Sequence, residues 1–213
     1  MTDQENSILW DSYFYPNTSV LINNFNIRDY DKLKKEEATR VFEKLAQLRY
    51  EILDMEIDKN RLNFLHKYLF GDIYPFAGQY RKVNMVKSRG SFFYIKDVED
   101  IDEELNKLFK EINKMKEYCQ NIRDFCNILS KLYTALIFIH PYREGNGRTI
   151  REFIREFSIK YSEELGIGLM ELDWGLINKE ELDECIEVVH LFPYSVSSLF
   201  KDALVSGQDL KNR

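Results

Sequence analysis

The chain has 213 residues, which is enough to bury one well-packed core, and no linker or low-complexity segment divides it. Its net charge of −6 argues against direct binding to nucleic acid, and no apolar run approaches the length of a membrane span. The three cysteines form an odd set without a disulfide framework, and no leader pattern opens the chain, so we expect a cytoplasmic protein.

Apolar residues recur with helical spacing over most of the chain. The first such pattern runs from residue 31 to about 55. Further helices are expected at 60–70, 97–116, 121–139, 147–163, 178–190 and 194–204. Residues 82–95 instead place β-favouring residues on both sides of a Ser-Arg-Gly-Ser turn, which predicts a β-hairpin. The predicted fold class is therefore all-α with one hairpin. His66 and His190 are interpreted as structural histidines.

The most informative stretch of the chain runs from His140 to Arg151. The helix at 121–139 should end near His140, because Pro141 disfavours the helical conformation in the residue before it. The turn Gly145-Asn146-Gly147 then opens a second helix. A glycine-containing turn at a helix N-terminus presents unpaired N–H groups and the positive end of the helix dipole, so this turn predicts an anion site.

Charged side chains surround this predicted anion site. Arg148 and Arg151 lie three residues apart on one helical face, where they can reach a phosphate chain. Glu144 precedes the turn and can hold a magnesium ion, which prefers one or two carboxylates plus substrate oxygens. Each feature has an ordinary structural explanation: a histidine before proline, a common turn, or surface ion pairs. Their joint occurrence in register favours a site for a nucleotide polyphosphate and its metal.

These residues resemble the signature of the Fic-domain family, His-x-Phe-x-(Asp/Glu)-Gly-Asn-Gly-Arg-x-x-Arg. The chain matches it at every position but one, because Tyr142 stands where phenylalanine is usual. An aromatic replacement should keep the packing, provided that its hydroxyl group finds a partner.

The resemblance implies a mainly helical Fic fold and transfer of AMP from ATP to a target hydroxyl. It implies that His140 is the general base, that Glu144 holds Mg²⁺ and that Arg151 binds the γ-phosphate. Gly145, Asn146 and Gly147 would bind the phosphates through backbone and side chain, and Arg148 would neutralise them.

The resemblance covers about residues 13–163, so we expect a single domain over 1–213 with its core at 13–163 and a helical extension at 164–213. Besides the motif, it includes the segment 70–81 and the opening residues 15–21. It also implies that the hairpin at 82–95 is a flap that clamps the target by strand addition. Lys87 and Phe92 match the family's flap residues, while Ser88 stands where glycine is common. An ordinary hairpin whose aromatic residues fill the core is the alternative.

Family members are often inhibited by a helix that carries Ser/Thr-x-x-x-Glu-Gly/Asn, whose glutamate pairs with the second motif arginine. Here the only Ser/Thr-x-x-x-Glu runs from Thr39 to Glu43, and Lys44 follows it instead of Gly or Asn. We therefore expect a separate small antitoxin whose glutamate binds Arg151, and a toxin whose target is a type II topoisomerase or, as a weaker alternative, a small GTPase. A self-inhibited housekeeping enzyme is another alternative.

Two further interpretations stay open. One is a Fic-like phosphotransferase or a different nucleotidyltransferase; the intact Gly145-Asn146-Gly147 turn favours AMP transfer, since kinase relatives depart from the motif there. The other is a non-catalytic interaction module, which predicts loss of the base or of an arginine. His140, Arg148 and Arg151 are all present.

Overall fold

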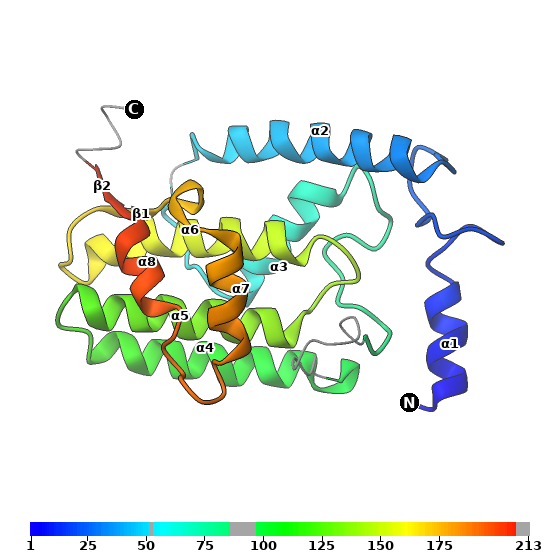
Figure 1. Ribbon diagram of the computed structural model, residues 1–213. Helices are drawn as coiled ribbons and strands as arrows, with labels where there is room; N and C mark the ends of the chain where they lie inside the picture. The colour runs from blue at the N-terminus through cyan, green and yellow to red at the C-terminus, as the bar shows by residue number, and fades with distance from the viewer. Residues whose placement is uncertain (52, 86–96, 208–213) are drawn as a thin grey trace.

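The computed structural model describes residues 1–51, 53–85 and 97–207, and these residues form a mainly helical domain (Figure 1). The elements follow the order α1 (Asp3–Asp11), α2 (Tyr30–Leu48), α3 (Lys59–Phe70), η1 (Val98–Asp100), α4 (Ile101–Glu117), α5 (Ile122–Ile139), α6 (Asn146–Glu164), β1 (Met170–Leu172), η2 (Trp174–Leu176), α7 (Lys179–Glu187), α8 (Ser197–Ala203) and β2 (Leu204–Ser206). The predicted fold class is confirmed.

The helices α5 and α6 form the centre of the fold. α5 packs against α4, α6 and α8, and α6 also packs against α3 and β1. Ten of the eighteen residues of α5 are buried, which is why its apolar residues recur so regularly in the sequence. Figure 1 shows α2 lying along one side, over α3, and α1 standing at the end where α5 connects to α6. The two helices that flank the connection, α5 and α6, are themselves largely buried, so they fix its two ends.

The predicted helix at 31–55 ends earlier than expected, at Leu48. Two ion pairs hold the residues after Leu48 against other parts of the chain, outside the path of a continued helix. Arg49 pairs with Glu171, and Glu51 pairs with Arg61 of α3 at 2.7 Å. Tertiary contacts of this kind override a helical propensity that the sequence alone carries. The helices predicted at 178–190 and 194–204 are likewise shorter, at Lys179–Glu187 and Ser197–Ala203.

Besides the short helix η2, two features were not predicted. The first is α1, whose N-terminus is closed by a capping box in which Thr2 and Glu5 bond each other's backbone N–H groups. The second is the antiparallel pair of β1 and β2, with Glu171 opposite Val205. Because each strand has only three residues, no alternating pattern marks it. The segment after residue 163 is therefore not purely helical.

The predicted hairpin at 82–95, with Lys87, Ser88 and Phe92, lies outside the described residues apart from residues 82–85. Within the described ranges no helix is long and apolar enough to cross a bilayer. Cys119, Cys126 and Cys185 are free thiols.

Candidate active site

His140 lies in the turn that follows α5, as Pro141 predicts. The helix ends at Ile139, and His140 adopts a left-handed conformation with φ 47° and ψ 61°. Its backbone N–H still donates to the carbonyl of Leu136 at 3.0 Å. This conformation costs a non-glycine residue about 1 kcal/mol, so surrounding contacts must hold the turn.

Arg81 supplies three of those contacts, a role that was not predicted from the sequence. It is 1% exposed. Its guanidinium donates to the carbonyl of His140 at 2.8 Å and to that of Ile139 at 3.3 Å, and its backbone N–H donates to Pro141 at 2.8 Å. Burial lowers the pKa of Arg81. Because carbonyl oxygens at a helix C-terminus carry partial negative charge, they favour a cation, and Arg81 thereby fixes the turn that presents His140.

Tyr142 and Asn146 close the loop between the two helices. The side-chain amide of Asn146 accepts from the Tyr142 N–H at 2.9 Å and donates to the Tyr142 carbonyl at 2.7 Å. These two bonds use one of the two N–H donors of the amide, so the prediction that Asn146 also binds phosphate stays a prediction. The Tyr142 ring is fully buried, and its hydroxyl donates to Oδ1 of Asn63 at 2.6 Å. The expected partner for the hydroxyl group is thus present.

His66 is the structural histidine that the sequence predicts. It is fully buried and stacks on Tyr142 with ring centroids 3.8 Å apart. Its Nδ1 accepts from the Gly78 N–H at 2.7 Å, which leaves Nε2–H to donate to the carbonyl of Glu144 at 3.0 Å. Burial lowers the pKa of His66 to about 4, so the ring stays neutral. His66 therefore ties the motif loop to the turn after α3.

Gly145 opens α6 and is packed against a ring of the core. Its φ is +80°, and a Cβ atom built there would lie 2.5 Å from the Phe70 ring. No side chain caps α6 among the described residues, and the first intrahelical bond runs from the Thr149 N–H to the Gly145 carbonyl at 3.1 Å. The N–H groups before Thr149 have no acceptor within the helix, as at any helix start. The structure thus forms the helix N-terminus that the sequence predicts as an anion site.

Arg148 makes contacts that the motif does not reveal. Its Nη2 lies 2.6 Å from Oε1 of Glu37 on α2 and 3.5 Å from Oε1 of Glu144. Its guanidinium lies over the Phe70 ring, 4.8 Å from the centroid. Arg148 is therefore held by a buried acid, by the motif acid and by an aromatic face.

Arg151 is exposed, one turn further along α6. Its backbone carbonyl accepts from the indole N–H of Trp174 at 2.9 Å. No ion pair engages its side chain within the described part of the chain. Its charge is thus available to a ligand.

One pocket of about 430 Å³ is lined by these parts: Met85, His140, Arg143, Glu144, Gly145, Asn146, Gly147, Arg148 and Arg151. The predicted base, the predicted metal ligand, the turn and both arginines are therefore brought together. The predicted flap residues Lys87, Ser88 and Phe92 lie outside the described residues.

Arg143, which the sequence did not single out, joins the motif loop to the N-terminal segment. It is 7% exposed, and its guanidinium lies 4.1 Å from the ring centroid of Trp10 and 5.1 Å from that of Phe14. Burial lowers its pKa. This cation–π packing fixes α1 against the site.

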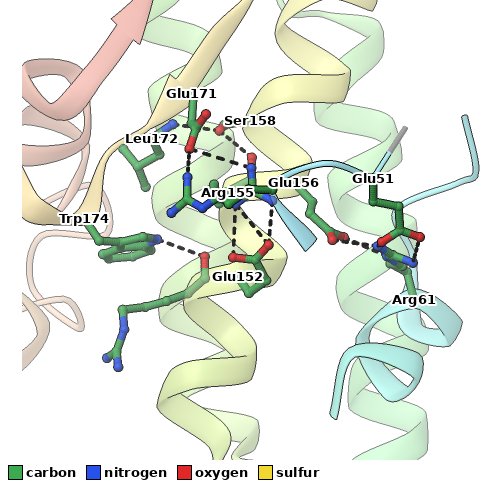
Figure 2. A network of polar contacts seen from close by, with 11 residues as sticks. Glu51, Arg61, Glu152, Arg155, Glu156, Ser158, Glu171, Leu172 and Trp174 are labelled. Carbon is green, nitrogen blue, oxygen red and sulfur yellow. Dashed lines mark hydrogen bonds and ion pairs between the residues drawn. The ribbon is translucent and has the colours of Figure 1, made fainter. Parts of the chain in front are cut away.

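Buried ion pairs hold the rest of α6 (Figure 2). Arg155 pairs with Glu152 at 2.6 Å, and Arg61 of α3 pairs with Glu156 at 2.6 Å. Burial raises the pKa of Glu156, against the effect of the adjacent Arg61. Glu152 and Arg155 both belong to α6, whereas the pair between Arg61 and Glu156 joins α6 to α3. Breaking that pair would leave an uncompensated buried charge, so it restrains the rotation of α6 about its axis, and with it the positions of Arg148 and Arg151.

The carboxylate of Glu144 suits a magnesium ion that takes most of its ligands from a nucleotide. It is 42% exposed, and one oxygen accepts from the Gly145 N–H at 3.0 Å. Within the described ranges no group of three or more His, Cys, Asp or Glu side chains forms a metal cluster. A single accessible carboxylate beside a phosphate site matches the preference of Mg²⁺ for one or two carboxylates, substrate oxygens and water.

Comparison with known proteins gives consistent matches. The Fic/DOC family profile matches residues 56–158. The chain is 34% identical over 149 residues to y4lH of Sinorhizobium fredii, named a "probable protein adenylyltransferase", and the match covers 68% of this chain and 73% of that protein. It is 28% identical over 172 residues to the protein adenylyltransferase VbhT of Bartonella schoenbuchensis. That match covers 81% of this chain but 34% of VbhT, so the chain spans about a third of that relative's length.

Solved structures show the same fold. BepC of Bartonella tribocorum, with bound AMPPNP, superposes with a TM-score of 0.78 at 22% identity. The superposition covers 92% of this chain and 97% of the BepC chain. The N-terminal Fic domain of a VirB-translocated Bep effector protein from Bartonella quintana, with bound ADP, gives a TM-score of 0.80 at 24% identity, and covers 95% and 98% of the two chains.

Proposed function

We propose, from the premise that the chain belongs to the Fic/DOC family, a protein adenylyltransferase. It would transfer AMP from ATP to a hydroxyl group of a target protein. The observation that carries the proposal is the pocket that joins His140 to the N-terminus of α6 and its two arginines. Relatives named protein adenylyltransferases, and neighbours with bound AMPPNP or ADP, support the choice of reaction and of ATP as substrate.

The proposed reaction begins with a proton transfer at His140. The imidazole takes the proton of a Tyr, Thr or Ser hydroxyl as that oxygen attacks the α-phosphorus of ATP. The bond from the α-phosphorus to the bridging oxygen breaks, and pyrophosphate leaves with the bonding electrons. The imidazolium then loses its proton to water. Arg81 contributes by holding the turn that carries His140.

The remaining residues position the nucleotide and stabilise its charge. The N–H groups at the start of α6, with Gly145, Asn146 and Gly147, would bind phosphate oxygens. Arg148 would neutralise the phosphates, and the exposed Arg151 would bind the γ-phosphate. Transfer of a phosphoryl-type group depends mostly on positioning and charge stabilisation, which these residues supply. Magnesium would be held by Glu144 together with phosphate oxygens, and when bound it would offset part of the nucleotide's charge.

The target would be clamped by the flap, through Lys87, Ser88 and Phe92, by addition of a strand. We propose a toxin that acts in the cytoplasm on a protein such as a type II topoisomerase. Its control would come from a small antitoxin whose Ser/Thr-x-x-x-Glu helix inserts a glutamate against Arg151. Two observations support a separate inhibitor: Glu43 lies exposed on α2, and Arg151 has no acidic partner among the described residues.

The test is label transfer from ATP radiolabelled at the α- or at the γ-phosphate, with magnesium and a bacterial lysate as the source of targets. AMP transfer predicts protein labelling from the α position only. Labelling from the γ position only would show a phosphotransferase and contradict the proposal. Purified protein that transfers no label until Glu43 is replaced by Gly would contradict the separate antitoxin.

A further inference from the structure

A carboxylate from outside the motif lies against the arginine that the proposed function assigns to the phosphates. Glu37 belongs to α2, and its Oε1 lies 2.6 Å from Nη2 of Arg148. Glu37 is 8% exposed. This is an ion pair with a buried carboxylate, and breaking such a pair is costly because it leaves an uncompensated charge in the interior. The contact therefore restricts the conformations of Arg148.

Glu37 is itself fixed by a second group. The hydroxyl of Tyr74, a residue 3% exposed in the turn after α3, donates to the other carboxylate oxygen. The Tyr74 ring stacks on Phe76 with centroids 4.9 Å apart. Each oxygen of Glu37 thus has a partner, so the carboxylate has little freedom to turn away from Arg148.

Glu37 does not line the proposed nucleotide site but a pocket that adjoins it. Glu37 and Tyr74 line a neighbouring pocket of about 360 Å³, whereas the motif pocket is lined by Arg148 without Glu37. Arg143, Glu144 and Arg148 line both pockets, and the guanidinium of Arg148 lies over the Phe70 ring. The contact with Glu37 uses part of the guanidinium, which has five N–H donors, and leaves others for an anion in the motif pocket.

We propose that Glu37 is a positioning residue that holds Arg148 in the orientation that binds the polyphosphate, with Tyr74 fixing Glu37. The inference rests on the proposed function, because it takes Arg148 to be a phosphate ligand. An arginine side chain that is ordered before the ligand arrives loses less conformational freedom on binding, so affinity for the anion rises. A carboxylate that instead inhibited the site would have to lie in the motif pocket and compete with phosphate.

The experiment compares Glu37→Gln with Glu43→Gln, a matched change at an exposed position of the same helix. Gln keeps the shape and an acceptor for Tyr74 but removes the charge that orients Arg148. Dissociation constants for Mg-ATP and for adenosine are measured by calorimetry, together with the melting temperature. We expect Glu37→Gln to weaken ATP binding about tenfold and to leave adenosine binding unchanged, while Glu43→Gln changes neither.

Two further variants make the result decisive. In the Arg148→Ala background, Glu37→Gln should weaken ATP binding no further, since Glu37 acts only through Arg148. Tyr74→Phe keeps the ring and should reproduce a smaller loss specific to ATP; it also tests the idea if Glu37→Gln does not fold.

The contrary results are distinct. Equal loss for ATP and adenosine would show a merely structural role, and unchanged or tighter ATP binding by Glu37→Gln would overturn the proposal. Wild-type protein that binds no ATP would refute the proposed function, and this inference with it.

Discussion

Replacing Gly145 by alanine should displace the loop that forms the anion site. The residue has φ +80°, and a Cβ atom there would lie 2.5 Å from two carbon atoms of the Phe70 ring, which is itself fully buried. The left-handed conformation alone costs a non-glycine residue about 1 kcal/mol. Forcing an extra carbon into a packed core typically costs roughly a further 1–3 kcal/mol. We therefore expect a loss in the free energy of unfolding of about 2–4 kcal/mol.

The matched control is Gly166→Ala. Gly166 has φ +72°, but nothing lies within 4 Å of the position of its Cβ atom, so this variant should lose only about 1 kcal/mol. Urea denaturation followed by circular dichroism gives both values, and Phe70→Leu in the Gly145→Ala background should recover part of the difference. Equal destabilisation by the two alanine variants would refute the packing argument. ATP affinity should fall for Gly145→Ala and stay unchanged for Gly166→Ala.

Three other predictions concern side chains around the motif. Burial lowers the pKa of His66 to about 4, whereas an unfolded histidine titrates near 6.5, so the unfolded state takes up the proton first. Stability is therefore full above pH 6.5 and is lost as the pH falls toward 4, by about 2 kcal/mol between pH 7 and 5. Denaturation curves should show this extra loss in wild type and in His190→Gln but not in His66→Gln; an equal loss in all three would contradict it. Tyr142→Phe leaves Oδ1 of Asn63 without its donor and should cost about 1 kcal/mol in thermal unfolding while transfer activity persists; abolished activity would be the contrary result. Arg81→Met leaves carbonyls around His140 without a donor and should cost about 3 kcal/mol in urea denaturation, so an unchanged midpoint would refute its role.

The parts of the fold that follow from local sequence were predictable. The helices at 60–70 and 121–139 match α3 and α5 to within a residue, because their apolar residues recur at helical spacing and polar N-caps precede them. The end of α5 follows from Pro141, and the start of α6 follows from the glycine turn. The motif was predictable for the same reason, since all its residues lie within twelve positions of one loop and one helix start.

The parts that depend on distant contacts were not predictable. Glu37 reaches Arg148 from α2, and Arg81 reaches His140 from the turn after α3. Glu37 has no distinguishing pattern around it, and Arg81, although it ends the segment 70–81 of the family resemblance, has none that indicates its contact with His140. Only the folded chain brings such pairs together. The one local signal that was available and missed is the capping box of α1, Thr2 with Glu5.

The central claim has two parts. His140 is the general base for AMP transfer, and the pocket still binds ATP when the His140 side chain is removed. The most direct measurement compares wild type with His140→Ala in two assays: transfer of label from α-labelled ATP to a bacterial lysate, and ATP affinity by calorimetry. We predict that the variant loses transfer by about 10²–10⁴-fold, the usual contribution of a general base, and keeps its ATP affinity within about threefold. Transfer at the wild-type rate by His140→Ala, with ATP binding intact, would contradict the account.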